Sequence, residues 1–377
     1  MKQYLKKYQV VIRTAGPVFI GSGREIGKKE YIFLEKGKVG ITDMQLLYQQ
    51  MKKRHKENEL EEYLLSNDRM NLTDWLKRQN ALDQNIRKTV KCELDCGDAL
   101  LEKGKGIQVL ECVKDAYGKP YIPGSSLKGM FRTILLCEDI IVNPSKYVEY
   151  GKELEKLSLQ NNQDRRINPT SFLKKEINDI EAAAYRTLGR GEPKDAKSAV
   201  NDIMQGFIVS DSEPLSADDL VLCQSVMLHT NEKKETRLPI LRECIKPDTE
   251  IRFTVTVDTS ICQLDSKAII DAVKTMIENY YKSFQNSFSG IPKLTTNSMF
   301  LGGGSGFVSK TIIYSMFPRE KGVAVTANIF DKTGVPKIHK HYKDISLGVS
   351  PHTLKCTYYQ KKLHQMGLCK LVKFSAV

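Results

Sequence analysis

The sequence predicts an α+β protein with a ferredoxin-like core, and three observations lead to this interpretation. Apolar and polar residues alternate at 8–14 and almost without error at 250–258, as in half-buried strands. Apolar residues follow helical spacing at 121–137 and 265–288. With a short strand near 206–211 and a return strand, the order is strand, helix, strand, strand, helix, strand, which is the ferredoxin-like plan.

The remaining segments are insertions in this core or extensions of it. We predict a discontinuous core at 1–42 and 97–311, a highly charged helical insertion at 43–96 and a loop-rich insertion at about 143–205. The C-terminal segment 312–377 either completes the core or forms a second small unit, and the sequence leaves both readings open.

The first candidate site is a turn rich in glycine and serine at residues 16–24, directly after the first strand. It contains Gly21, Ser22, Gly23 and Arg24. A cation beside flexible backbone is compatible with phosphate binding, although this turn alone is a weak signal.

The second candidate site is the start of the helix at 121–137, which reads YIPGSSLKGMFRTILLC. Pro123 and Gly124 break the preceding strand, and Ser125 or Ser126 is a candidate N-cap. Lys128 and Arg132 lie four residues apart, beside the helix N-terminus, where a phosphodiester would be favoured. A Lys–Arg pair on a helix is more often a solvated face, so this motif also needs support from the others.

The third candidate site is the densest glycine run in the chain, with Gly302, Gly303, Gly304, Ser305 and Gly306, followed by Phe307 and Lys310. Such a run can hold phosphate in a nest of backbone N–H groups. It is not a nucleotide-hydrolysing P-loop, because Ser309 stands before Lys310 where that motif requires glycine. A tightly packed structural turn is the other alternative.

Charge favours a polyanionic partner. The 377 residues carry a net charge of +13, divided into +8 over residues 1–54, −3 over the middle and +8 over 332–377. Lysine and arginine contacts to phosphates release condensed counterions, so nucleic acid is the first candidate, and a lysine-rich solubilising surface is the alternative. No apolar run approaches the roughly 18 residues that would span a bilayer, and we expect a cytoplasmic protein without membrane contact.

Signals for catalysis and metal binding are weak. The nine cysteines include no C-x-x-C pair, so reduced thiols are expected rather than a zinc site. None of the six histidines falls in a candidate turn, and the lysine-rich context of His339 and His341 indicates solvated surface. Asp43 and Asp115 are loop acids that nothing singles out. We therefore predict no catalytic residues, no metal and no cofactor.

The three turns also resemble a known family, the RAMP superfamily of CRISPR-associated proteins. Further segments are similar to one branch of it, the fifth subunits of type III-A Csm effector complexes. The resemblance covers essentially the whole chain, in consistent order. The segments that carry it are PVFIGSG (17–23), IPGSSLKGMFR (122–132), IVSDSEPL (208–215), LPILRECIKPDTEIRF (238–253), FLGGGSGF (300–307) and HQMGLCKLVKF (364–374).

The resemblance implies an RRM-like core, which leaves room for a second, degenerate RRM-like unit at 312–377. It also implies a non-catalytic RNA-binding subunit that caps the 3′ end of the CRISPR RNA and the filament of backbone subunits. The implied partners are the CRISPR RNA, a neighbouring backbone subunit and through it the rest of the complex, target RNA indirectly, and nucleases that it could recruit. The glycine run would be the family's glycine-rich loop, and Lys128 and Arg132 would face the guide.

The predicted RNA-binding residues combine all three turns. They are Gly21, Ser22, Gly23, Arg24, Ser125, Ser126, Lys128, Arg132, Gly302, Gly303, Gly304, Ser305, Gly306, Phe307 and Lys310. Two other functions remain open at this point. One is an endoribonuclease that processes precursor CRISPR RNA, and the other is an adaptor that acts through the insertion at 43–96.

Overall fold

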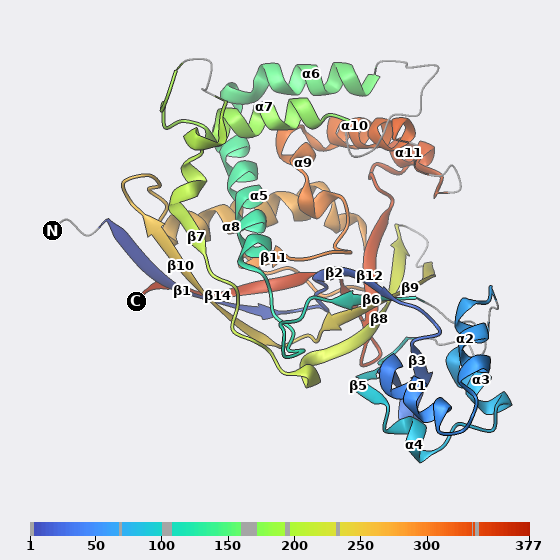
Figure 1. Ribbon diagram of the computed structural model, residues 1–377. Coiled ribbons are helices and arrows are strands. Elements are labelled where there is room, and N and C mark those ends of the chain that lie inside the picture. Colours follow the sequence, from blue (N-terminus) through green and yellow to red (C-terminus); the bar gives the residue numbers. More distant parts are fainter. Residues whose placement is uncertain are drawn as a thin grey trace.

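The computed structural model describes residues 4–67, 70–99, 108–159, 172–192, 197–230, 234–333, 335 and 339–377. Their strands form sheets of five, six and three strands, and most of the helices lie on one side of the two larger sheets (Figure 1). The predicted α+β class is confirmed. The loop-rich insertion predicted at about 143–205 lies partly outside the described residues. None of the helices in these ranges is long and apolar enough to cross a membrane.

The five-stranded sheet contains the ferredoxin-like plan, and all of its pairs are antiparallel. In spatial order its strands are β11 (Ser298–Phe300), β14 (Leu368–Ala376), β1 (Leu5–Thr14), β10 (Glu250–Asp258) and β7 (Phe207–Val209). β1, the first strand of the ferredoxin-like plan, therefore lies between β10, the third strand of the plan, and β14, the return strand. The alternation at 250–258 predicts the bounds of β10 correctly, because its odd positions face the core.

Two helices cover this sheet, α5 (Gly124–Val142) and α8 (Ser266–Ser283). Each buries its apolar stripe, which includes Phe131 on α5 and Ile277 on α8. Phe131 packs edge-on against Phe207 of β7 and Phe374 of β14, at ring-centre distances of 5.9 and 6.1 Å. Burying a side chain of this size stabilises the fold by about 1.5–3 kcal/mol.

The six-stranded sheet was not predicted as a sheet. In spatial order it contains β13 (Lys362–Gln365), β12 (Thr353–Tyr359), β8 (Leu220–His229), β9 (Glu235–Ile245), β6 (Val109–Cys112) and β2 (Gly21–Ile26). Only its β6–β9 pair is parallel. The prediction of a turn through residue 24 is wrong, since strand β2 begins at Gly21. Its first five residues are exposed, so they lack the apolar alternation that marks a strand.

The third sheet belongs to a small lobe at the lower right of Figure 1. It consists of β3 (Tyr31–Phe33), β4 (Lys38–Thr42) and β5 (Val90–Asp95), with helices α1 (Met44–Lys52), α2 (Glu57–Leu65), α3 (Leu72–Arg78) and α4 (Gln84–Arg87). The lobe has its own hydrophobic core, in which the rings of Tyr63 and Trp75 stack 4.7 Å apart.

The remaining helices lie in the upper part of Figure 1, on the same side of the large sheets as α5. They are α6 (Val148–Leu159), α7 (Lys174–Tyr185), α9 (Ile313–Met316), α10 (Arg319–Lys332) and α11 (Asp344–Leu347). The end of the chain serves both large sheets, because β12 and β13 extend the six-stranded sheet while β14 pairs with β1. The boundaries of the predicted domains themselves stay predictions.

A buried ion pair fixes the loop after β6 to the centre of the six-stranded sheet. The side chain of Glu243 on β9 is fully buried, and both of its carboxylate oxygens lie 2.7 Å from Nζ of Lys114. The N–H of Cys112 donates a further hydrogen bond to this carboxylate, at 2.9 Å. Such a pair is costly to break, because the remaining charge stays buried without compensation.

We predict that Lys114→Met lowers the free energy of unfolding by about 3 kcal/mol, because it leaves the buried Glu243 carboxylate unpaired. Adding Glu243→Gln restores most of this loss, since the amide oxygen still accepts from Cys112. Urea unfolding of the three proteins measures both effects. In the exposed pair Lys152–Glu149, Lys152→Met is the control and changes stability by less than about 0.5 kcal/mol. Equal effects of the two lysine variants would contradict the prediction.

Candidate nucleic-acid interface

The backbone of residues 17–20 ties together the loops that surround the candidate site. It hydrogen-bonds to four segments that are distant in sequence. The partners are Gly303 of the glycine run at 2.7 Å, Ile245 at the end of β9 at 2.7 and 3.0 Å, Gly367 before β14 at 2.8 Å, and Val113 after β6 at 2.8 Å. The PVFIGSG motif is therefore a structural junction as well as a candidate binding turn.

The glycine run depends on glycine for its shape. Gly302, Gly304 and Gly306 adopt φ values of +82°, +77° and +96°, which L side chains rarely adopt. A Cβ atom on Gly302 would lie 2.3 Å from the carbonyl oxygen of Phe19. Ser305 is buried, and its hydroxyl donates to the carbonyl of Gly302 at 3.3 Å. The loop is held in one shape against residues 17–20.

A cleft of about 490 Å³, which we call the motif cleft, brings members of all three predicted turns together. Its lining includes Gly21 of the first turn, Ser126 of the second, and Gly302, Gly303 and Lys310 of the third. These segments lie on β2, α5 and the loop after β11, so the tertiary fold creates the juxtaposition. That RNA binds there stays a prediction.

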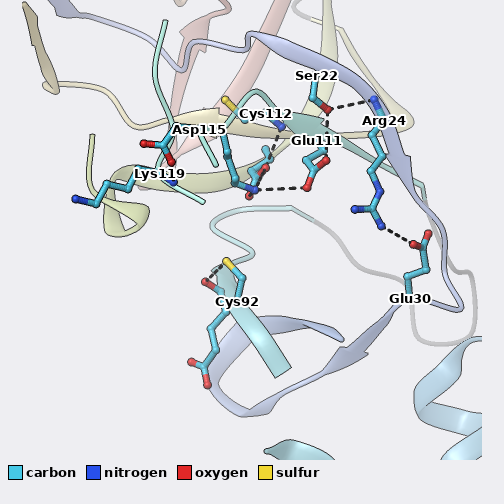
Figure 2. Close-up of polar contacts among 11 residues, drawn as sticks. Ser22, Arg24, Glu30, Cys92, Glu111, Cys112, Asp115 and Lys119 are labelled. Carbon is cyan, nitrogen blue, oxygen red and sulfur yellow. Dashed lines mark hydrogen bonds and ion pairs between the residues drawn. The ribbon is translucent and has the colours of Figure 1, made fainter. Parts of the chain in front are cut away.

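The other residues of the first turn lie on the exposed part of β2 (Figure 2). The hydroxyl of Ser22 donates to Glu111 at 3.4 Å and accepts from the N–H of Arg24 at 3.1 Å. The guanidinium of Arg24 forms an ion pair with Glu30 at 2.8 Å. Two acids thus lie beside the predicted cationic turn, which weakens its attraction for phosphate.

The helix start differs from the prediction. The residue before α5 is Pro123, so neither Ser125 nor Ser126 is the N-cap. Instead, the carboxylate of Asp211 accepts a hydrogen bond from the N–H of Gly124 at 2.7 Å. The serine-cap prediction is therefore wrong, and a carboxylate from the segment after β7 occupies this end of the helix. Ser125 is exposed, whereas Ser126 lines the motif cleft.

Lys128 and Arg132 face away from the motif cleft. The guanidinium of Arg132 pairs with Glu181 at 3.0 Å and with Asp202 at 2.8 Å, and it lies over the ring of Tyr185. Burial lowers the pKa of Lys128, and the charge of nearby Asp202 offsets part of this effect. This geometry supports a stabilising role for Arg132 in holding α7 against α5.

A second cleft of about 390 Å³, the glycine-loop cleft, contains cations that were not predicted from the sequence. Arg242 of β9 and Lys355 of β12 join Lys310, Gly304 and Gly306 in its lining. No aspartate or glutamate lines it among the described residues. Positive charge therefore gathers against the glycine run without a carboxylate to balance it.

The cations of the glycine-loop cleft are partly desolvated. Burial lowers the pKa of Arg242, Lys310 and Lys355, and the charge of Arg242 lowers that of Lys355 further. Arg242 donates from Nη1 to the hydroxyl of Ser225, while its buried Nε has no hydrogen-bond partner among the described residues. An anion in the cleft would compensate the charges of these three side chains and would supply hydrogen-bond acceptors for donors such as the Nε–H of Arg242.

A third cleft of about 990 Å³, the histidine cleft, adjoins the second through Phe307 and Lys355. It is lined by four of the six histidines, His229, His339, His341 and His352. The prediction that His341 is solvated surface is wrong, because its side chain is only 15% exposed and packs 4.5 Å from Phe330. Sequence spacing could not show this, since the histidines come from three separate segments.

The two loop acids, Asp43 and Asp115, accept hydrogen bonds from nearby backbone N–H groups. Asp43 caps α1 by accepting from two backbone N–H groups, and Asp115 accepts from those of Tyr117 and Lys119 at 2.9 and 2.8 Å. Among the described residues, the one group whose ligand atoms lie close enough for a metal ion is His341, Asp344 and His352. The distances within that group are hydrogen-bond distances.

We predict that Gly302→Ala lowers the free energy of unfolding by at least about 2 kcal/mol, since it adds left-handed strain to a clash with Phe19. The matched control is Gly129→Ala on α5, where a Cβ meets nothing within 4 Å and the φ is helical. It should be neutral or stabilise by up to about 1 kcal/mol. Thermal unfolding of both variants checks this, and a tolerated Gly302→Ala would show that the loop is not constrained as described.

Comparison with known proteins gives a consistent family. The sequence profile of the RAMP superfamily matches residues 11–309. A Mycobacterium tuberculosis protein named CRISPR system Cms protein Csm5 is 28% identical, over 98% of both chains. A Streptococcus thermophilus protein of the same name is 26% identical, over 83% of this chain and 82% of the relative.

Solved structures share the fold. A chain from a cryo-EM structure of a Csm–crRNA–target RNA ternary complex of a type III-A CRISPR-Cas system aligns with a TM-score of 0.65 at 20% identity, over 97% of this chain and all of that one. The crystal structure of T. onnurineus Csm5 aligns with a TM-score of 0.55 at 17% identity, over 96% of this chain and all of that one.

Proposed function

The chain belongs to the RAMP superfamily, and from this premise we propose that it is an RNA-binding subunit of a type III-A CRISPR effector complex. It holds the 3′ end of the CRISPR RNA and acts without catalysis. The names of its relatives and its likeness to a chain of the Csm–crRNA complex support the choice of complex. Its proposed partners are the guide RNA and a neighbouring backbone subunit, through which it reaches the rest of the complex and target RNA. A cytoplasmic location accords with these partners.

The observation that carries this function is the convergence of Arg242, Lys310 and Lys355 on the glycine run without an opposing carboxylate. An RNA backbone supplies the missing negative charge at regular intervals. The guanidinium of Arg242 can donate two parallel hydrogen bonds to one phosphate, whereas the two lysines act as point charges.

The clefts suit a subunit that accepts guides of many sequences. Phosphate contacts do not depend on base identity, and stacking on an aromatic ring is also tolerant of sequence. Phe307 lies between the glycine-loop and histidine clefts and is half-buried, with its ring 5.0 Å from that of Phe330. Its exposed part is available to a base.

We predict that replacing Arg242, Lys310 and Lys355 together with alanine weakens binding of single-stranded RNA at least tenfold. In the linear plot of log affinity against log salt, the slope becomes smaller in magnitude by about 0.7 for each phosphate that the variant no longer neutralises, or about 2 in total. Fluorescence anisotropy with RNAs of several sequences, between about 50 and 300 mM KCl, measures both quantities, because screening changes strongly over this range.

The charge-matched control replaces Lys267, Lys274 and Lys282, three exposed lysines of α8 that do not line the cleft. It removes the same net charge, so it corrects for general attraction to the protein. If both triple variants bind RNA equally well, the glycine-loop cleft is not the binding site. Circular dichroism spectra establish that each variant is folded.

The endoribonuclease alternative requires imidazoles near a bound phosphodiester, and the histidine cleft supplies them beside the glycine run. Incubation of the purified protein with precursor CRISPR RNA, with and without a chelator, separates the two functions. We expect the RNA to remain intact under both conditions. Specific cleavage that disappears in the triple alanine variant would replace a passive binding role with an enzymatic one.

A further inference from the structure

A buried carboxylate orients two imidazoles in the histidine cleft. The side chain of Asp344 has no exposed surface. One of its oxygens lies 2.6 Å from Nδ1 of His352, and the other lies 3.0 Å from Nδ1 of His341. The hydroxyl of Ser350 donates to the second oxygen at 2.6 Å. Three hydrogen bonds from three side chains therefore fix this carboxylate.

This arrangement assigns different roles to the two nitrogens of each ring. When Nδ1–H donates to Asp344, the neutral imidazole has its lone pair on Nε2. Both rings also line the histidine cleft, with centres 5.2 Å apart and planes at 55°. Two oriented imidazoles thus border one cavity, and their Nδ1 atoms are already used.

The surroundings favour an anion over a metal ion as the ligand. The cleft is lined by basic side chains, and no aspartate or glutamate lines it among the described residues. A divalent cation would meet this positive charge, while a phosphate would be attracted by it. The basic residues in the lining are His229, Lys234, His339, Lys340, His341, Lys343, His352 and Lys355.

The size and the apolar lining of the histidine cleft suit a nucleotide. Its volume of about 990 Å³ is at the upper end of the usual range for small-molecule sites. Apolar side chains, including Leu238, Phe307 and Phe330, form much of the lining and offer surfaces for a base. Phe307 and Lys355 also line the glycine-loop cleft, so a chain bound there can continue into this cavity.

We propose that the histidine cleft binds a terminal nucleotide through its phosphate monoester, which the Nε2 atoms of His341 and His352 hold. Where that nucleotide is the end of a bound RNA, the inference rests on the proposed function. It adds that the protein distinguishes an RNA with a 3′-phosphate from one with a 3′-hydroxyl. No covalent bond forms or breaks in this step.

The Asp344 carboxylate is a fixed negative charge behind the two rings. It accepts from Nδ1 of each ring, and a proton of the ring or of the phosphate then lies between Nε2 and a phosphate oxygen. Burial would raise the pKa of Asp344, but hydrogen bonds from His341, His352 and Ser350 outweigh it, so its pKa lies below the ordinary value. The carboxylate is therefore ionised throughout the range in which histidines titrate.

Other basic groups surround the two imidazoles and add to the positive charge that a phosphate would meet. Burial lowers the pKa of His339, and the charges of His341, Lys355 and His352 lower it further. Several other titratable groups lie around the imidazoles besides Asp344. They are His229 from β8, Lys234 just before β9, His339, Lys340 and Lys343 from the preceding segment, Lys355 from β12, and Tyr314 from α9.

The test compares three probes by calorimetry on the full-length protein. They are a short RNA with a 3′-phosphate, the same RNA with a 3′-hydroxyl, and free adenosine 3′-monophosphate. The phosphorylated RNA should bind about tenfold more tightly than the hydroxyl form, and the free nucleotide should bind in the same cleft.

Two variants isolate the Nε2 atoms. His341→Asn and His352→Asn keep an N–H near the position of Nδ1 for Asp344 but remove Nε2. Each should abolish most of the preference for the phosphorylated RNA, so that its affinity falls to about that of the hydroxyl form. The control is His55→Asn, a histidine of the small lobe outside the cleft, whose φ of 57° asparagine tolerates. It should retain the full preference.

The remaining outcomes separate this inference from the proposed function. Tight, salt-dependent binding of both RNAs without any preference overturns the terminal-phosphate site and leaves the RNA-binding role intact. Binding of the free nucleotide but of neither RNA retains the phosphate site and contradicts the RNA-binding role. Stoichiometric Zn²⁺ binding that strengthens with rising pH and is lost in His352→Asn would overturn the inference in favour of a metal site.

Discussion

The hydrogen bonds of residues 17–20 are the constraint on which the interface depends. This short stretch follows β1 of the five-stranded sheet and leads into β2 of the six-stranded sheet, so it passes between the two. The carbonyl of Phe19 accepts from Gly303 of the glycine run, and the pairing of Val18 with Ile245 fixes the end of β9, the strand that carries Arg242. A loop with three left-handed glycines would otherwise sample many shapes, and the cost of ordering it would weaken binding.

The clefts are positively charged because carboxylates of the chain form their hydrogen bonds and ion pairs elsewhere in the protein. The carboxylate of Glu243 pairs with Lys114, and that of Asp211 accepts from the start of α5. The carboxylate of Asp344 binds the two histidines. The cations of the glycine-loop cleft have no comparable acidic partner among the described residues of its lining. The interface is therefore positive because of local pairing, although the middle of the chain has a net charge of only −3.

The sequence could predict the order of the core elements and the glycine run, because strand and helix periodicity and glycine runs are local signals. The first motif, by contrast, runs into strand β2 at Gly21, and its exposed residues carry no apolar alternation. It could not predict that Arg132 is paired, since Glu181 and Asp202 lie 49 and 70 residues further along. Arg242 and Lys355 come from strands β9 and β12, and only the order of the six-stranded sheet brings them near the glycine run. In the histidine cleft, only the fold brings His229 of β8 to the segment 339–352. The contacts of His341 and His352 with Asp344 are local, but the lysine-rich context of this segment indicated solvated surface instead.

The most direct test of this account is a cryo-EM structure of the assembled complex with its guide RNA. The account predicts that the 3′ segment of the guide crosses the glycine-loop cleft, with phosphate oxygens within hydrogen-bond distance of Arg242, Lys310 and Lys355. A guide that ends on another surface, with that cleft empty and the three side chains in contact with solvent or protein alone, would contradict it.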